Sequence, residues 1–475
     1  MTPQEKMLKL YQRIRDDFYR CREDLIVAGR AFNSTLLLVM SSFLLQVNVI
    51  LFGDYGQGKT SVAELVAAIM AGLPYPAVIA SEVRGSPEIT EEKLIGRLHL
   101  GKLQQGEEVV LWSTFVKAPV HIIDEIVRIP PIKQAFILEG ARTGRWLYLG
   151  QLLDTGRTPL FATANVEDLS GGSFTLIPAL ADRFAIGLDA LYPRVQATLE
   201  LAIGSDLEEK LAQAGLMDHA GEAIALLTSS DYDRERLLRF MEGFKRHLER
   251  HGFTPLYAPE LETARGEIQG MPLSERAKQF LGLLISSLNF CLKMGQKRGA
   301  GFGEGEGAQR ECPKDCPHYD TPCSWVLGGG SRRQEHELVQ LARTLAWLLG
   351  AEQVEPEHLR AVAPFVLWHR RSFSRTLLAK VEARQRLYPV KLEAARLFVE
   401  EVYREFSEMK ELLDYAHENL PELKRRFAEG DGRADLLELG QRHVRLVELP
   451  PYIQDLLDLE ELRWEPVQKE ACKEA

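Results

Sequence analysis

Residues 53–60 read GDYGQGKT and match the phosphate-binding pattern G-x-x-x-x-G-K-[ST]. The preceding run, VNVILF at 47–52, has the β-branched, apolar character of a buried strand. The following run, SVAELVAAIMAG at 61–72, is predicted to form a helix that ends at Gly72. The pattern requires a strand before it and a helix after it, and a chance glycine-rich turn would have neither. We therefore expect an α/β domain with a parallel sheet and a P-loop.

The residues of this loop have distinct expected roles. The glycines allow backbone amides to face phosphate oxygens, and the helix N-terminus adds a positive dipole. Lys59 would contact the β- and γ-phosphates of ATP, and the Thr60 hydroxyl would bind Mg²⁺. The predicted nucleotide contacts are Gly53, Asp54, Tyr55, Gly56, Gln57, Gly58, Lys59, Thr60 and Ser61.

Two later apolar runs end in polar side chains that suit hydrolysis of a phosphoanhydride. The run at 119–123 leads into Asp124 and Glu125, and Asp124 follows Lys59 by 65 residues. Asp124 would complete the Mg²⁺ site, and Glu125 would polarise the attacking water. The run at 159–164 leads into Asn165, whose amide could orient that water, although the residue alone would be read as a turn asparagine.

In this order, the motifs resemble the MoxR family of AAA+ ATPases, over about 27–184 and again over about 272–369. The loop residues 54–57, DYGQ, differ from the family's Pro-Pro-Gly-Leu, and Val127 replaces an asparagine. The similar segments are Val27-Ala28-Gly29-Arg30, Ser86-Pro87-Glu88 through Leu94-Ile95-Gly96, Asp124-Glu125-Ile126-Val127-Arg128 with Pro130-Pro131, Gln134 and Leu138-Glu139, Ala181-Asp182-Arg183-Phe184, Gly329-Gly330-Ser331-Arg332-Arg333, and Val354-Glu355-Pro356-Glu357 to Leu367.

The resemblance implies a fold and further site residues. The fold would be an AAA+ core with a parallel five-stranded sheet, an all-α lid with inserts, and a helical C-terminal extension. Val27 and Gly29 would lie beside the adenine, and Arg183 would be an arginine finger that reaches a neighbouring subunit's nucleotide. Without the resemblance, Arg183 would be read as a solvated or ion-paired side chain. Arg333 would be the sensor 2 arginine, and its place in a first helical turn, where a cation opposes the dipole, suggests a nearby anion.

The family also implies a homo-oligomeric ring, expected to be hexameric, with two hairpins that face its pore. The first hairpin is predicted near 98–112, with a turn at 104–106, and the second from Arg145 to Thr158, with a turn at 154–156. Trp146 and Tyr148 could grip a substrate chain there, or could simply pack within the hairpin.

The expected domains are an AAA+ core at 1–190, a helical lid at 191–371 and an acidic helical extension at 372–475. The lid would contain an inserted helix with the apolar stripe Leu237, Leu238, Met241, Phe244 and Leu248. A second lid helix is predicted at 272–295, with Ser274 as its cap. The last 75 residues hold 19 acidic and 11 basic side chains, so they contribute −8 to a net charge of −10. This acidic balance opposes nucleic-acid binding, which requires basic surface.

A loop at 299–330 gathers Cys312, Cys316, His318 and Cys323 between glycine-rich flanks. Such a short polar loop cannot bury a core, so we expect a metal to order it. The residue types suit a zinc site. An iron–sulfur cluster with three cysteine ligands is the alternative. If no metal binds, the three cysteines would be free thiols in the loop or would form a redox disulfide.

These features predict an ATPase that acts as a chaperone-like motor, remodels a protein client, or assists metal or cofactor insertion during enzyme maturation. The resemblance implies a protein partner with a von Willebrand factor A domain. A nucleotide-dependent assembly switch with slow turnover is the alternative, and a nucleic-acid motor is a third possibility that the charge opposes. The apolar run at 35–52 includes Ser41, Ser42, Gln46 and Asn48 and is read as a buried helix and strand, not a membrane span. With no secretory leader and few cysteines, we expect a cytoplasmic protein.

Overall fold

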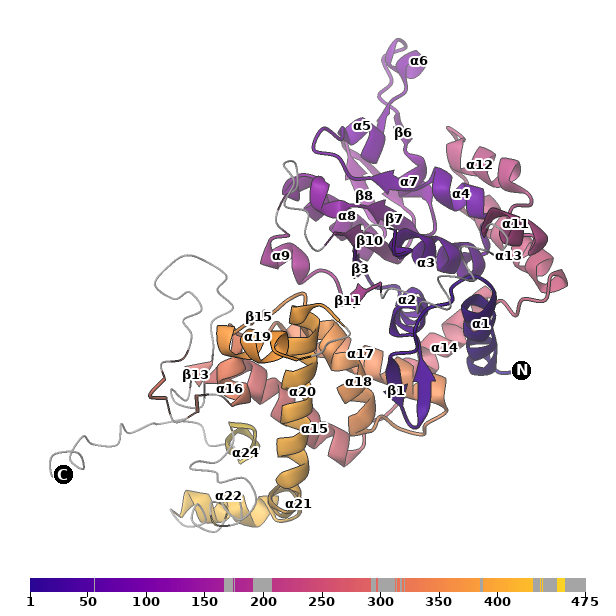
Figure 1. Cartoon of the computed structure of the whole chain (residues 1–475). Coiled ribbons are helices and arrows are strands. Elements are labelled where there is room, and N and C mark those ends of the chain that lie inside the picture. The colour runs from indigo at the N-terminus through magenta and orange to yellow at the C-terminus, as the bar shows by residue number, and fades with distance from the viewer. Residues whose placement is uncertain are drawn as a thin grey trace. The chain divides into compact units, whose positions relative to one another are not determined.

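The computed structural model describes residues 1–475 except 55, 166–173, 175, 191–206, 292–295, 298–311, 313, 317, 320, 385–387, 430–435, 437, 439–450 and 458–475. The described residues pack as two compact units (Figure 1). One unit comprises Met1–Pro272 with Gln340–Gln353, and the other comprises Leu273–Val339 with Val354–Ala475. The boundary expected at residue 190 therefore falls inside the first unit.

The first unit is built on a five-stranded sheet with the order β11-β3-β10-β7-β4. Each neighbouring pair is parallel, which confirms the predicted fold class. The central strands β3, β7 and β10 are mainly apolar and buried because a parallel sheet is covered on both faces. The bounds of the five strands are β3 Val49–Phe52, β4 Val83–Arg84, β7 His121–Asp124, β10 Leu160–Ala164 and β11 Ile186–Asp189.

The apolar run at 35–52 forms a buried helix and then a strand, as predicted. Helix α2, Ser34–Leu45, begins where the Asn33 side chain accepts a hydrogen bond from Leu36 N at 2.8 Å. The described part of the chain holds no helix long and apolar enough to cross a membrane.

The other helices of the first unit surround this sheet and extend to residue 270. Helix α3 continues into η1, so the helix predicted after the P-loop is present but ends as a π-helix. Helix α13 packs on η1, and Leu238 is 42% exposed, so it does not belong to the buried stripe of that helix. The bounds are α1 Pro3–Asp17, α3 Lys59–Val66, η1 Ala67–Gly72, α4 Tyr75–Ala80, α5 Glu91–Leu94, α7 Thr114–Lys117, η2 Ile126–Arg128, α8 Pro131–Thr143, α9 Pro178–Ala181, α11 Leu207–Gln213, α12 Ala220–Thr228, α13 Arg234–Arg250 and α14 Ala258–Gly270.

Three antiparallel pairs accompany the sheet in the first unit. The pair β1 Leu25–Val27 and β2 Arg30–Phe32 turns at residues 28–29. The pair β5 Gly96–Leu98 and β6 Val110–Trp112 forms the first predicted hairpin, with α6 Leu100–Leu103 at its projecting tip (Figure 1). The pair β8 Arg145–Tyr148 and β9 Gln151–Asp154 forms the second.

The second unit is mainly helical. The Ser274 side chain caps α15 by accepting from Ala277 N at 3.0 Å, as predicted, but the helix stops at Asn289, before Cys291. The bounds are α15 Glu275–Asn289, β12 Phe290–Cys291, β13 Gln296–Lys297, α16 Pro322–Trp325, β14 Val326–Leu327, α18 Pro356–Leu367, β15 Ser372–Phe373, α19 Arg375–Glu382, α20 Val390–Glu408, α21 Lys410–Glu418, α22 Leu420–Ala428 and α24 Pro451–Leu456, while α17 Arg332–Leu349 belongs partly to each unit.

Candidate nucleotide-binding site

Strand order brings the predicted site residues together. β10 lies between β3 and β7 and is parallel to both, so the carboxyl ends of these three strands meet at one edge of the sheet. The P-loop follows β3, Asp124 ends β7, and Asn165 follows β10. In open α/β sheets, this edge is where ligands bind.

Lys59 is the first residue of α3, and its ammonium lies inside the P-loop, where a phosphate group would bind. The preceding Gly58 has φ +74°, a left-handed conformation that a side chain would strain. Lys59 Nζ donates to Gly53 O at 2.6 Å, to Asp54 O at 3.1 Å and to Asn165 Oδ1 at 2.5 Å. Burial lowers the pKa of Lys59, while the carboxylates of Asp124 and Asp54 oppose that effect. The ammonium is thus already aimed at the loop interior.

Thr60 and Asp124 form the pair expected for Mg²⁺. Thr60 Oγ1 donates to Asp124 Oδ1 at 3.0 Å. A second hydroxyl, from Thr163 on β10, donates to the same oxygen at 2.7 Å. Ser61 follows in the first turn of α3 and is half-buried, and Tyr55 lies outside the described residues.

Glu125 lies in a constrained position directly after β7. Its φ is +57°, which is uncommon for a residue with a side chain. Its backbone N–H donates to Thr163 Oγ1 at 2.9 Å. On the side chain, Oε1 accepts from Asn165 Nδ2 at 3.1 Å, and Oε2 lies 2.9 Å from Arg128 Nε. The carboxylate is therefore oriented by one amide and one guanidinium.

Asn165 connects the two halves of this constellation. Its amide oxygen accepts from Lys59, and its amide nitrogen donates to Glu125. Thr163 precedes it by two residues, so both side chains lie on one face of β10. The sequence analysis did not identify Thr163, although its two-residue spacing from Asn165 was a signal that could have indicated it.

Asp189 ends β11 next to the loop and was also missed. It is 7% exposed, and burial raises the pKa of its carboxyl to about 7, with the Asp54 charge adding to that rise and Lys59 opposing it. Its backbone oxygen accepts from Thr35 Oγ1 at 2.8 Å, which ties the end of β11 to α2. A carboxyl at a strand end is an ordinary feature, so the sequence alone could not distinguish it.

Three other predicted site residues are Arg183, Val27 and Gly29, and the first of them contacts α8. Arg183 Nη1 donates to Ala135 O at 3.0 Å and lies 3.9 Å from Glu139. Its arginine-finger role stays a prediction. Val27 is buried in β1 and Gly29 occupies the turn after it. Their place beside adenine also stays a prediction.

Arg333 lies in the first turn of α17, as predicted, and is exposed. Ser331 Oγ accepts from Gln334 N at 3.2 Å and caps that helix. The sensor 2 role of Arg333 stays a prediction.

The second hairpin corrects two expectations. Its turn lies at residues 149–150, not at 154–156, because β8 pairs with β9 from Arg145↔Asp154 to Tyr148↔Gln151. Trp146 is 1% exposed and packs against Phe115 and His121, so it cannot grip a substrate chain. The exposed apolar side chains of this hairpin are instead Leu147, Leu149 and Leu152.

The cysteine loop does not form the expected metal cluster. Cys312, Cys316, His318 and Cys323 are all described, yet no three of them bring ligand atoms within 4.8 Å of one another. Cys316 and Cys323 are buried, where a thiol packs as a small apolar group. The zinc or iron–sulfur prediction therefore has no support from the structure.

Comparison with known proteins now adds to this geometry. The model of the AAA domain, dynein-related subfamily, matches residues 48–184, and the AAA lid domain model matches residues 324–388. Protein MoxR of Paracoccus denitrificans is 24% identical over 383 residues, which cover 78% of this chain and 91% of that protein. The chain therefore carries an AAA domain and an AAA lid domain, and over most of its length it is similar to protein MoxR.

A crystal structure of a candidate ATPase from Cytophaga hutchinsonii supports the fold of this chain. It superposes with a TM-score of 0.51 at 17% identity, covering 84% of this chain and 96% of that one. The matched AAA domain model ends at Phe184, one residue after Arg183, and contains the P-loop, Asp124, Glu125 and Asn165.

Proposed function

We propose that this MoxR-like protein hydrolyses ATP with Mg²⁺ and uses the cycle to remodel a protein partner. The observation that carries the proposal is the contact of Asn165 with both Lys59, at 2.5 Å, and Glu125, at 3.1 Å. The Asn165 amide thereby links Lys59, which is expected to contact the γ-phosphate, to Glu125, which is expected to activate the attacking water.

The donor set at the sheet edge fits Mg²⁺. Thr60 and Asp124 offer a hydroxyl and a carboxylate, the oxygen ligands that this ion prefers, and they already lie 3.0 Å apart. Bound there, Mg²⁺ would neutralise charge on the phosphates. Thr163, which donates to the same carboxylate oxygen as Thr60, would help to hold Asp124 in place.

The protein groups then have separable tasks. Lys59 would exchange its contacts with Gly53 O and Asp54 O for phosphate oxygens, which are better partners for a cation. Glu125 would accept the proton of the attacking water, and Asn165 would hold that carboxylate and the water in register. Because the left-handed backbone of Glu125 is fixed by Thr163, its carboxylate needs little reorganisation.

For the work on a partner, we propose a ring of six subunits in the cytoplasm. Arg183 would act on the nucleotide of the adjacent subunit, and Arg333 would contact phosphate within its own subunit. The exposed leucines of the hairpins would contact the client. These are Leu100, Leu103, Leu147, Leu149 and Leu152. A von Willebrand factor A domain protein is the partner class proposed from family resemblance.

A nucleotide-dependent assembly switch with slow turnover is the second candidate. The ion pair of Glu125 with Arg128, at 2.9 Å, favours it, because a paired carboxylate is a poorer base. Steady-state ATP turnover of the assembled protein separates the two functions.

The test compares nucleotide binding and phosphate release for three variants. Lys59→Ala should lose binding, while Glu125→Gln should keep binding and lose about 10²-fold or more in turnover. Lys278→Ala, a surface lysine of α15, is the matched control and should behave as the native protein. Equal ATP turnover for Glu125→Gln and the native protein would refute the assignment. A client is then sought by pull-down with the ATP-bound Glu125→Gln protein.

A further inference from the structure

A histidine pair and a carboxylate meet at the end of α13, away from the proposed nucleotide residues. His247 and His251 are four residues apart, so both rings lie on one face of the helix end. Asp218 lies in the turn between α11 and α12. One ligand atom from each of these three residues lies within 4.8 Å of the others, and among the described residues this is the one such group found.

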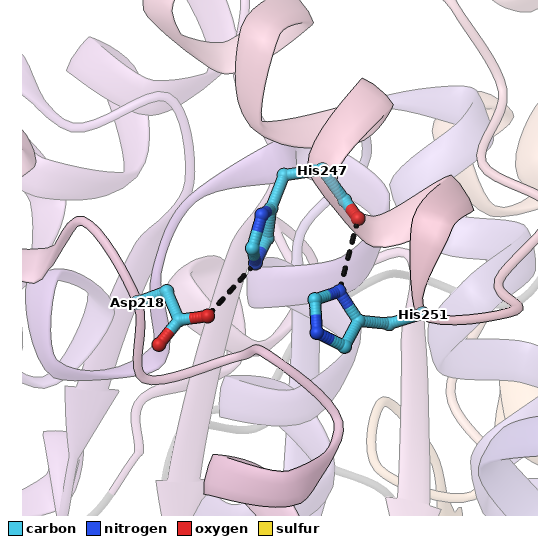
Figure 2. Close-up of side chains that lie close together, drawn as sticks. All are labelled: Asp218, His247 and His251. Carbon is cyan, nitrogen blue, oxygen red and sulfur yellow. Dashed lines mark hydrogen bonds and ion pairs between the residues drawn. The ribbon is translucent and has the colours of Figure 1, made fainter.

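The orientation of the side chains suits ligation. His251 Nδ1 lies 3.1 Å from the backbone oxygen of His247 (Figure 2). A hydrogen bond donated from Nδ1 to that oxygen leaves Nε2 as the nitrogen with a lone pair, and metal-bound histidines are commonly fixed in this manner. In Figure 2 this second nitrogen faces the gap beside Asp218 and His247.

His247 supplies the second nitrogen. Its Nε2 atom is buried and makes no hydrogen bond within the described part of the chain, although Asp218 Oδ2 lies 3.0 Å away. A buried imidazole nitrogen needs a partner, and here the candidates are the Asp218 carboxylate or an ion bound by both groups. A cation between the two groups would satisfy both.

The backbone around the cluster leaves room for this arrangement. Gly215 has φ +71°, and a Cβ at this position would lie 2.7 Å from His247 Nε2 and 2.8 Å from His251 Nδ1. The turn is also tied to the P-loop side of the unit, because Leu216 O accepts from Tyr75 N at 2.8 Å. An ion here would connect this turn to α13, which packs on η1 behind the P-loop helix.

We propose that Asp218, His247 and His251 form a binding site for a divalent transition-metal ion of the Zn²⁺ class. Two imidazoles and one carboxylate are a donor set that such ions accept, with water completing the coordination. A hard cation such as Mg²⁺ prefers oxygen ligands and would bind this set poorly. The ion connects the turn before α12 to the end of α13 and thereby stabilises the first unit.

The experiment titrates Zn²⁺ into the chelator-treated full-length protein by calorimetry, with Cys312→Ser and Cys316→Ser present throughout to remove competing thiolates. His251→Gln and Asp218→Asn should each weaken binding at least as much as the roughly 10–100-fold seen for partners of metal ligands. His336→Gln, an exposed histidine of α17, is the matched control and should bind normally.

Thermal unfolding with and without Zn²⁺ distinguishes a lost ligand from a lost fold. In chelator, His251→Gln should melt near the native temperature, and only the native protein should gain stability from Zn²⁺, since an ion that binds the folded state alone stabilises it. A Co²⁺ absorption spectrum without thiolate charge-transfer bands would agree. Zn²⁺ binding that is absent, or equal in native protein and His251→Gln, would overturn the proposal.

Discussion

Arg128 Nε lies 2.9 Å from Glu125 Oε2, within the short helical turn that follows β7. The turn itself is fixed by Gln134, whose buried amide donates to Ile126 O at 3.1 Å and to Ile129 O at 2.7 Å. The carboxylate proposed to activate water is therefore paired with a cation from its own loop.

This pair predicts that Arg128 restrains ATP turnover. Replacing it in Arg128→Gln should raise basal turnover by about fivefold, the rate equivalent of the roughly 1 kcal/mol that a half-exposed ion pair contributes. Nucleotide affinity should not change, because Arg128 pairs with Glu125, which is proposed to act on the attacking water and not on the phosphates. Arg425→Gln breaks an ion pair of the same i,i+3 spacing on α22 and should leave turnover unchanged. A fall in the turnover of Arg128→Gln would instead make Arg128 a positioning residue.

Thr163 should matter for hydrolysis although it does not reach the nucleotide directly in our proposal. Thr163→Val keeps the shape but removes the hydroxyl that bonds Asp124 and the Glu125 backbone. We expect lower ATP turnover and a stability loss of about 1–3 kcal/mol, since buried partners lose their hydrogen bonds. Thr163→Ser keeps the hydroxyl and should retain most activity. Phosphate release and urea unfolding measure the two effects, and equal turnover of the valine and serine variants would contradict the positioning role.

Arg183 is predicted to act on the neighbouring subunit. Neither Arg183→Ala nor Glu125→Gln should hydrolyse ATP efficiently alone, because arginine fingers contribute about 10³–10⁵ in rate in other systems. Mixed rings should regain activity, since some interfaces then pair an intact Glu125 with an intact Arg183. Phosphate release across mixing ratios tests this. If subunit mixing is verified and no ratio recovers activity, Arg183 does not act in trans.

Truncation of two adjacent residues on β8, Trp146 and Leu147, should affect the stability of the protein very differently. Trp146→Ala removes a ring that is 1% exposed and should cost about 3–5 kcal/mol of unfolding free energy. Leu147→Ala changes a side chain that is 62% exposed and should cost less than about 0.5 kcal/mol. Urea unfolding measures both. If the leucine contacts a client, Leu147→Ala should weaken client engagement without affecting ATP binding.

Asp189 predicts a pH dependence of stability. Burial raises its pKa from 3.8 to about 7, so between these values the folded protein keeps a proton that the unfolded chain releases. This carboxyl therefore destabilises the fold increasingly as the pH rises, with the full effect above pH 7. Asp189→Asn should be more stable than the native protein at pH 8, by at most about 4 kcal/mol, and nearly equal to it at pH 4. Urea unfolding without nucleotide at both pH values measures this, and a difference that does not grow with pH would refute it.

Local pattern singled out the P-loop, Asp124, Glu125 and Asn165 as site candidates, and the structure brings these residues together at one edge of the sheet. Buried parallel strands are apolar along their length, and polar residues at their carboxyl ends are visible as interruptions of those runs. The same reasoning could not distinguish Thr163 from the other residues of β10. Its hydroxyl has a role only because β7 packs alongside and brings Asp124 and Glu125 within hydrogen-bond distance.

The sequence by itself determined the nucleotide-binding class of this protein, since strand, glycine loop and helix are adjacent in the chain and their chemistry is local. Tertiary structure alone decided which contacts form between distant residues. It buried Trp146, left the described residues of the 312–323 loop without three metal-ligand atoms within 4.8 Å of one another, and brought Asp218 to His247 and His251. The physical reason is that burial and ligand geometry depend on how helices and strands pack, which residue spacing along the chain does not specify.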